Sequence, residues 1–205
     1  MSAEAANDSA ADPGRRHFLV VATTTVGLVG IGATAVPFLE SWRPSAQAKA
    51  LGQPVEVDIG KLDVGGLMKI EWRGRAIYIV YRTPEMLAKL ADSSEKAMLR
   101  DPNSENEDQQ PKYIKGDTRS IKPQYLVLEG VCTHLGCAPG ARFQPGDPEL
   151  GASWPGGFYC PCHGSRFDLA GRVFKDVPAP DNLKVPPYRF LSDTLLMIGS
   201  DPGVA

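Results

Sequence analysis

From residue 54 onward the chain alternates short apolar and polar runs, as half-buried β-strands do. Apolar side chains occupy every second position over 55–59. Two runs rich in β-branched and aromatic residues, 67–72 and 75–81, flank Arg73 and Gly74, and this spacing predicts a β-hairpin. Further strands are predicted over 125–128, 156–159, 172–174, 184–190 and 194–198.

One helix is predicted among these strands. Thr83 can cap it, Pro84 suits its first position, and the helical pattern continues to about Leu99. Residues 101–118 are polar and acidic, which predicts an exposed loop. Many short strands with one inserted helix predict a mostly β domain.

The N-terminal part has a different pattern. Residues 18–39 carry no charged side chain, and this run of 22 residues exceeds the length of about 20 that a transmembrane helix needs. The pattern predicts a polar disordered tail over 1–14 and a twin-arginine motif with a membrane anchor over 15–41. A flexible, alanine-containing tether over 42–53 and a soluble domain over 54–205 complete the predicted organisation.

Two arginines, Arg15 and Arg16, directly precede the apolar run, as in bacterial twin-arginine export signals. A cleaved signal peptide is one interpretation, with 46–48 (Ala-Gln-Ala) as its cleavage site. The length of the apolar run favours the other interpretation, a retained single-pass anchor. Arginines before the run favour a cytoplasmic N-terminus, with the C-terminal domain outside the cytoplasm.

Composition then directs attention to a few side chains. A net charge of −2 over 205 residues gives no reason to expect a nucleic-acid partner. The chain contains 4 cysteines and 3 histidines. All the cysteines and two of the histidines lie within 132–137 and 160–163, while His17 lies apart.

These two segments are candidate metal-binding boxes, with the sequences CTHLGC over 132–137 and CPCHGS over 160–165. On a tight loop, a residue two or three positions from a cysteine can reach the same metal centre, so each box can supply one thiolate and one imidazole. Gly136 and Gly164 allow sharp turns and close approach of amide groups to sulfur. Two cysteines and two histidines also suit a structural zinc site, and the spacing alone does not exclude one. Two disulfides with incidental histidines are a third reading.

The pattern C-x-H-x-G-C followed by C-x-C-H-G-S resembles the Rieske iron–sulfur family. The resemblance implies one [2Fe–2S] Rieske cluster, with Cys132 and Cys160 on the inner iron and His134 and His163 on the outer iron. Neutral imidazoles in place of thiolates would raise its potential. The family also has an antiparallel β domain with a cluster-binding subdomain, here about 128–181. The resemblance further implies that the two remaining cysteines of the chain, Cys137 and Cys162, form a disulfide between the two loops.

The whole chain from Arg15 onward resembles the Rieske subunit of bacterial ubiquinol–cytochrome c reductase, the cytochrome bc complex. The resemblance implies a subunit of a dimeric complex in the bacterial inner membrane, with its Rieske domain in the periplasm. It would carry one electron from quinol, bound at cytochrome b, to a c-type cytochrome. His163 would contact quinol and receive a proton, and the tether would act as a hinge.

Other members of the same superfamily fit less well. The small Rieske subunit of arsenite oxidase is the main rival, and the retained membrane helix favours the reductase. A Rieske oxygenase needs two further histidines for its mononuclear iron, and only His17 lies outside the two boxes.

Further residues acquire expected roles from the resemblance. Ser165 would donate its hydroxyl to a bridging sulfide, and Leu135 would be an exposed docking contact. Phe167 stands where many high-potential members have a tyrosine, which predicts a lower potential. Residues 177–180 resemble the proline loop that shields the cluster, with Val177 in place of the usual glycine. The residues expected around the cluster are therefore Gly136, Gly164, Ser165, Phe167, Pro178 and Pro180.

Overall fold

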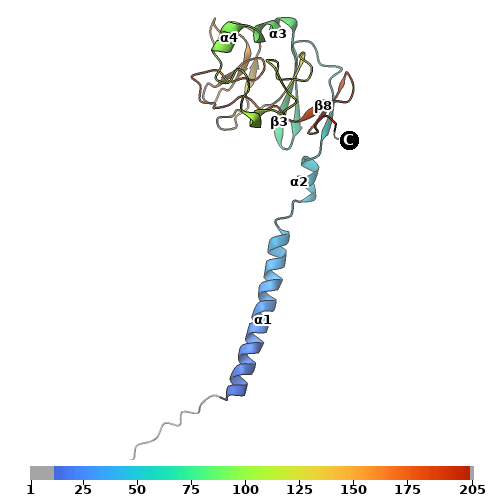
Figure 1. Cartoon of the computed structure of the whole chain (residues 1–205), viewed down its shortest axis with the longest axis vertical. Coiled ribbons are helices and arrows are strands. Elements are labelled where there is room, and N and C mark those ends of the chain that lie inside the picture. The colour runs from blue at the N-terminus through green and yellow to red at the C-terminus, as the bar shows by residue number, and fades with distance from the viewer. Residues whose placement is uncertain (1–11, 204–205) are drawn as a thin grey trace, which may run out of the picture. The chain divides into compact units, whose positions relative to one another are not determined.

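The structure, a computed structural model, describes residues 12–203. The chain divides into two compact units at Lys49 and Ala50, and each unit is considered by itself. Most of the predicted tail, residues 1–11, lies outside the described residues, and the last residues of that tail already belong to the first helix. The order of the elements can be followed by colour in Figure 1.

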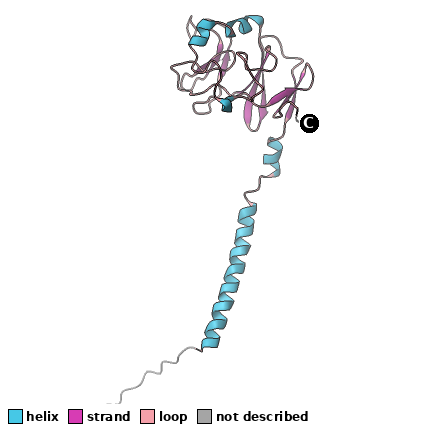
Figure 2. Cartoon of the chain, in the orientation of Figure 1, coloured by secondary structure: helices cyan, strands magenta, loops and turns pink. Residues whose placement is uncertain are grey.

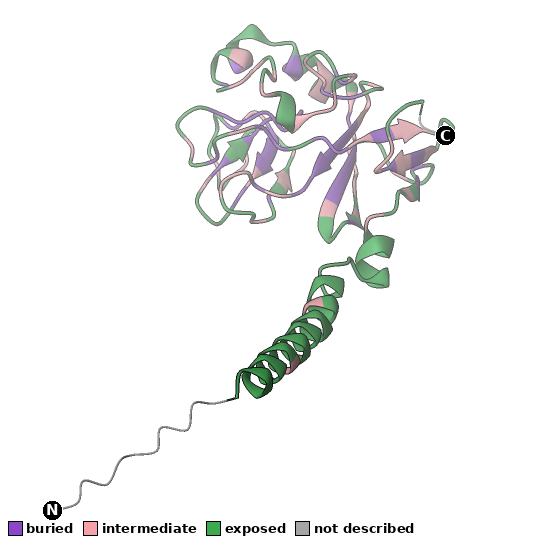
Figure 3. Cartoon of the chain, turned by 60° about the horizontal axis from the view of Figure 1, so that its bottom comes forward, coloured by how far each residue is buried: buried purple, intermediate pink, exposed green. Residues whose placement is uncertain are grey.

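The first unit is dominated by helix α1, Pro13–Glu40. Asp12 caps it by accepting a hydrogen bond from the amide of Gly14, and Pro13 occupies the first turn, where its missing amide N–H costs nothing. None of its residues is buried within the chain, as the exposed colouring in Figure 3 shows. With a mean hydropathy of 1.9 in its most apolar window, α1 is long and apolar enough to cross a membrane.

The predicted tether contains a short helix, α2, Ala46–Leu51. All six of its residues are exposed, and the hydroxyl of Ser45 accepts a hydrogen bond from the amide of Ala48 at its start. An isolated helix of this length is marginal in water, because nucleation costs more than a few hydrogen bonds return. Its flexibility therefore stays a prediction.

The second unit is a mostly β domain, which confirms the predicted fold class (Figure 2). Its described residues, 50–203, form three antiparallel sheets of three strands each. The turn of the predicted hairpin, Arg73 and Gly74, has positive φ angles of 53° and 70°, as tight hairpin turns require. In spatial order the sheets are β1 (Val55–Asp58), β9 (Leu195–Ile198) and β8 (Tyr188–Phe190); β2 (Leu67–Trp72), β3 (Arg75–Tyr81) and β4 (Tyr125–Glu129); and β5 (Gly140–Arg142), β6 (Gly157–Tyr159) and β7 (Arg166–Phe167).

The predicted helix that begins after Thr83 is two helices, and its prediction as a single helix to Leu99 is wrong. Helix α3, Pro84–Leu90, is capped by Thr83 as expected, but α4, Ser93–Ala97, begins anew. The side chain of Asp92 accepts a hydrogen bond from the amide of Ser94, and this local bond competes with continuation of α3.

Two further expectations about this domain need correction. The 101–118 segment is not simply an exposed loop, because it contains the 3-10 helix η1, Glu107–Gln109, and buries Ile114 in the core. The predicted strand at 172–174 forms only isolated bridges, and the one predicted over 184–190 is confined to β8. The short strands β5 and β7 carry too few residues to show a pattern in the sequence.

The main core packs against the sheet formed by β5, β6 and β7. Tyr78 of β3 is buried and stacks on Phe158 of β6, with ring centroids 6.1 Å apart. Its hydroxyl donates to the carbonyl of Pro139, 2.9 Å away, in the connection that follows the first box. Gly130 leaves room for the Tyr78 ring, since a Cβ atom at this position would overlap it. The contacts of Tyr78 therefore position the backbone on both sides of the first box.

Candidate metal centre

The two boxes form loops with the same backbone geometry. In the first loop, after β4, the amide of Gly136 donates to the carbonyl of Cys132 at 2.9 Å. In the second, between β6 and β7, the amide of Gly164 donates to the carbonyl of Cys160 at 3.0 Å. Both glycines have positive φ, 84° and 77°, a region that residues with a Cβ atom seldom adopt. Each glycine therefore lets its loop turn back on its own cysteine.

A disulfide between Cys137 and Cys162 joins the two loops, which confirms the predicted pairing. The sulfur of Cys160 lies within 4.8 Å of both disulfide sulfurs. Those three sulfurs are not themselves a ligand set, because two of them are bonded to each other. The bridge instead lies beside the metal site and holds one loop against the other.

The four expected ligands lie on these two loops, one cysteine and one histidine on each. Cys132 and Cys160 are free thiols, each 2% exposed. The rings of His134 and His163 lie nearly perpendicular, with centroids 4.8 Å apart. Of the two rings, His163 is the exposed one and His134 is half-buried. Two enclosed sulfurs and two outer imidazoles form the donor set that a [2Fe–2S] cluster with mixed ligands requires.

The environment of Cys132 fits a metal-bound thiolate. Burial raises the pKa of this thiol, while hydrogen bonds from the amide of His134 and the hydroxyl of Ser165 oppose that rise. Without metal the sulfur therefore retains its proton, and metal binding would release it. The same two hydrogen bonds would stabilise the thiolate form.

Ser165 and Phe167 lie beside the ligands with different surroundings. Ser165 is buried, and its oxygen accepts a hydrogen bond of 3.0 Å from the amide of Ala179, which leaves its own hydroxyl proton free to donate. The expected bond of this proton to a bridging sulfide stays a prediction. Phe167 is fully buried within the main core, to which Cys132 and Cys160 also belong.

The expected docking and shielding residues surround the histidines. Leu135, next to His134, is 71% exposed, so its side chain is accessible to a partner. Asp176, directly before the proline loop, has a positive φ of 59°, and Val177 does not. The valine therefore fits its position without backbone strain, although many relatives would be expected to have glycine there.

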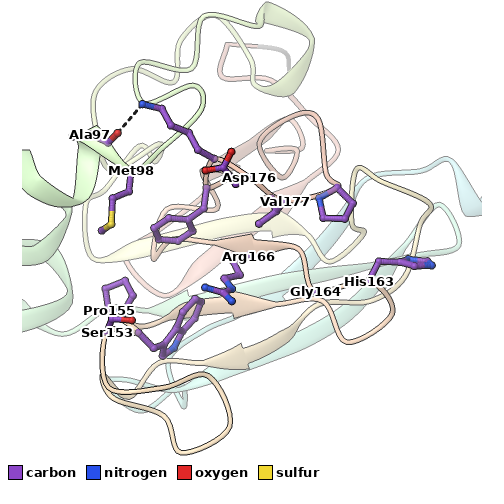
Figure 4. Close-up of a pocket in the computed structure, with 13 residues that line it drawn as sticks. Ala97, Met98, Ser153, Pro155, His163, Gly164, Arg166, Asp176 and Val177 are labelled. Carbon is purple, nitrogen blue, oxygen red and sulfur yellow. Dashed lines mark hydrogen bonds between the residues drawn. The ribbon is translucent and has the colours of Figure 1, made fainter.

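A cavity of about 600 Å³ opens beside the second loop. Figure 4 shows His163 and Gly164 at one end and Met98 and Pro155 toward the other. Buried Trp154 and Phe174 form its apolar floor. The exposed imidazole therefore borders an open, partly apolar space.

Two residues that hold the site were missed in the sequence. The hydroxyl of Thr133 donates to the carbonyl of Asp181 at 2.7 Å and so ties the first loop to the end of the proline loop. Arg100 donates to three carbonyls of the proline loop. Each contact joins residues far apart in the chain, and no local pattern signals it.

Comparison with known proteins gives a consistent result. Residues 104–187 match the family model described as "Rieske [2Fe-2S] domain", and residues 5–45 match "Ubiquitinol-cytochrome C reductase Fe-S subunit TAT signal". The second match confirms the predicted twin-arginine signal.

Curated relatives share most of the chain's length. The "Ubiquinol-cytochrome c reductase iron-sulfur subunit" of Allochromatium vinosum is 56% identical over 93% of this chain and 91% of that protein. The protein of the same name from Bradyrhizobium diazoefficiens is 41% identical over 93% and 97%. A solved chain described as "Hyperthermophilic respiratory Complex III" is 24% identical over 86% of this chain and 98% of that chain, with a TM-score of 0.44.

Proposed function

Because the chain belongs to the family of ubiquinol–cytochrome c reductase iron–sulfur subunits, we propose that His163 is the residue through which it meets quinol. The chain is an electron-transfer subunit of a quinol–cytochrome c reductase, and its partners are the cytochrome b and cytochrome c1 subunits of that complex. We assign the contact with quinol to the side chain of His163.

The Rieske domain binds one [2Fe–2S] cluster, which supplies one-electron chemistry when bound. We assign its ligands as Cys132, Cys160, His134 and His163. The two buried thiols would anchor the cluster on the side of the core, where water is excluded. The two imidazoles would face outward, where electrons enter and leave.

The exposure of His163 carries the assignment of the quinol contact. His163 is exposed and borders the cavity of about 600 Å³, whereas His134 is half-buried. The ring nitrogen of a metal-bound histidine that does not touch the metal is free to form a hydrogen bond. Ferric iron withdraws electron density from a bound imidazole, so in the oxidised protein this nitrogen of His163 would carry no proton. It would then accept the hydrogen bond of a quinol hydroxyl and take up its proton as one electron passes from the quinol to the cluster.

Electron paramagnetic resonance of the reduced cluster in native membranes tests this contact. A hydrogen bond between quinone and a cluster ligand changes the electronic environment of the iron, so we expect the spectrum to differ between quinone-replete and quinone-extracted membranes. Adding quinone back should restore the first spectrum. Identical spectra in all three samples would contradict the contact.

Leu135 provides a second test on the same surface. Leu135→Ala should lower quinol-dependent reduction of cytochrome c severalfold, because the exposed side chain contributes buried apolar area only in the docked state. The midpoint potential should not change, since the variant leaves all four ligands in place. Val64, which is 59% exposed outside the boxes, supplies the control Val64→Ala, for which we expect full activity.

No observation favours the alternative functions. The curated relatives described above are named as reductase subunits, which supports neither the arsenite oxidase subunit nor a structural zinc module. The dimeric state of the complex stays a prediction.

The proposed membrane topology places the N-terminus in the cytoplasm and the Rieske domain in the periplasm. The twin-arginine signal match and the apolar helix α1 support it. In cells whose outer membrane has been opened, added protease should digest the domain of the wild-type chain. Replacing Arg15 and Arg16 together by lysine should protect the domain, because export would be blocked. Protection of the wild-type domain would contradict the topology.

A further inference from the structure

The proline loop has few hydrogen bonds of its own. Pro178 and Pro180 have no amide N–H, so only two of its four residues can donate. The amide of Ala179 donates to the hydroxyl oxygen of Ser165 at 3.0 Å. A loop of this kind cannot join a sheet, and its position therefore depends on contacts from outside.

Arg100 supplies most of those contacts. Its Nη1 atom lies 3.1 Å from the carbonyl oxygen of Ala179 and 3.4 Å from that of Pro180, and Nη2 lies 3.2 Å from that of Val177. Three of the four carbonyls in the loop thus accept hydrogen bonds from one guanidinium group. The planar group presents several donors in a fixed arrangement, which suits it to hold several acceptors together.

The backbone beneath Arg100 is itself held in place. The amide of Arg100 donates to the carbonyl of Val173 at 2.9 Å, and the amide of Lys175 donates to the carbonyl of Met98 at 2.9 Å. The Lys175 ammonium group donates to the carbonyl of Ala97, a contact drawn as a dashed line in Figure 4. The guanidinium therefore extends from a fixed position toward the loop.

The far end of the loop is attached without Arg100. Thr133 donates to the carbonyl of Asp181 at 2.7 Å. The side chain of Asn182 accepts from the amide of Val173 at 2.8 Å and donates to the carbonyl of Asp101 at 3.0 Å. Loss of the Arg100 side chain should therefore loosen residues 177–180 without unfolding the domain.

We propose that Arg100 is a positioning residue that holds the proline loop against the ligand loops and so protects the cluster from water. Ser165 links the two, because it belongs to the second ligand loop and its hydroxyl oxygen accepts from the amide of Ala179 at 3.0 Å. When the loop moves away, Ser165 loses one partner and the ligand sulfur becomes accessible. This role concerns the cluster and does not require the quinol contact.

The test uses the full-length chain with its cluster, purified in detergent, as wild type, Arg100→Gln and Arg100→Lys. Hydrogen–deuterium exchange at the amide of Ala179 should become about tenfold faster or more in Arg100→Gln. A tenfold change corresponds to about 1.4 kcal/mol, which is within what the loss of hydrogen bonds from a charged donor can cause. Loss of the cluster to a chelator should be severalfold faster, and its midpoint potential should fall.

Two controls separate the role of Arg100 from general effects. Arg73→Gln removes an exposed arginine at the β2–β3 turn, where it stacks on Trp72, and should change none of these readouts. Exchange in β3 should match wild type in every variant, which shows that the domain stays folded. Arg100→Lys retains the charge but not the fixed arrangement of donors, so it should behave like Arg100→Gln.

Three results would overturn the proposal. Unchanged exchange at Ala179 in Arg100→Gln would show that Arg100 does not hold the loop. Faster exchange with unchanged loss of the cluster would show that the loop does not protect it. Full restoration by Arg100→Lys would show that charge alone matters. None of these measurements uses quinol, so their failure is distinguishable from failure of the His163 assignment.

Discussion

At Phe167, next to the metal site, one added oxygen atom would change the midpoint potential of the cluster. Phe167→Tyr should raise the midpoint potential, because a phenol hydroxyl can donate to a ligand sulfur and stabilise the more negative reduced cluster. A preference of about 1 kcal/mol for the reduced form corresponds to roughly 40 mV for one electron. Redox titration of the full-length chain measures the shift.

The control for this substitution is Phe143→Tyr, which adds the same atom outside the ligand loops and packs on the same core. Its potential should equal that of wild type. An unchanged potential in Phe167→Tyr would show that Phe167 serves only as core packing, consistent with its complete burial.

Glu95 of α4 is a buried side chain whose titration affects the stability of the folded chain. It is 5% exposed, and one of its carboxylate oxygens has no hydrogen-bond partner among the described residues. Burial, and after it the nearby charge of Asp168, raises the pKa of Glu95 to about 7, while Arg172, Lys89 and other neighbours modify this shift. The folded chain therefore keeps a proton that the unfolded chain has already released at neutral pH.

The sign of the pH effect follows from this difference. The stability contributed by protonated Glu95 is fully present below the ordinary glutamate pKa of 4.5 and is lost as the pH rises through about 7. Glu95→Gln should therefore raise the free energy of unfolding by about 1–3 kcal/mol at pH 8 and change it little at pH 4.

Denaturant unfolding of the full-length chain at both pH values measures this effect. Glu107→Gln is the matched control, because that side chain is 79% exposed, and it should leave the stability unchanged at either pH. A gain from Glu95→Gln of the same size at pH 4 and pH 8 would contradict the titration of Glu95.

At the scale of elements, the disulfide between the two ligand loops is the clearest target. Replacing Cys137 and Cys162 together by serine should lower the stability of the metal-free chain by about 3 kcal/mol, because the bridge closes a segment with a sequence separation of 25 residues. The cluster should also be lost faster to a chelator. Both cysteines are replaced, since a single free thiol could form a wrong pair with Cys132 or Cys160.

Reduction of the wild-type disulfide without mutation provides the comparison. The reduced wild-type chain and the double serine variant should lose the cluster at similar rates. If the oxidised wild type and the double variant lose it equally slowly, the bridge does not stabilise the loops around the cluster.

At the scale of the whole molecule, we predict that the tether lets the domain reach two electron-transfer partners. Replacing residues 46–51 by proline should slow quinol-dependent reduction of cytochrome c severalfold, because polyproline is a semi-rigid spacer. The paramagnetic spectrum and the midpoint potential should stay unchanged, since the domain itself is intact. A glycine–serine segment of equal length is the control and should preserve the rate. Equal rates in both variants would contradict the hinge.

Much of the secondary structure could be predicted from the sequence, because its signals are local. The apolar run predicted α1, and the period-two segment predicted β1. Runs rich in β-branched, aromatic and other apolar residues predicted β2, β3 and β4, and Arg73-Gly74 predicted the hairpin turn. Local competition was harder to foresee, as the break between α3 and α4 at Asp92 shows. The strands β5 and β7, of three and two residues, form only because the core aligns them with β6.

The same division holds for the metal site. The amino-acid sequence by itself determined the ligand types and the family resemblance, because a cysteine and a histidine on one tight loop can reach one metal. Only the tertiary structure decided which imidazole is exposed, that Ser165 accepts a hydrogen bond from Ala179, and that Arg100 donates hydrogen bonds to the proline loop. These features depend on contacts between residues more than 10 positions apart, such as Arg100 and Ala179, which are 79 positions apart. Such contacts are set by how the core packs the sheets together, and no short stretch of sequence encodes that packing.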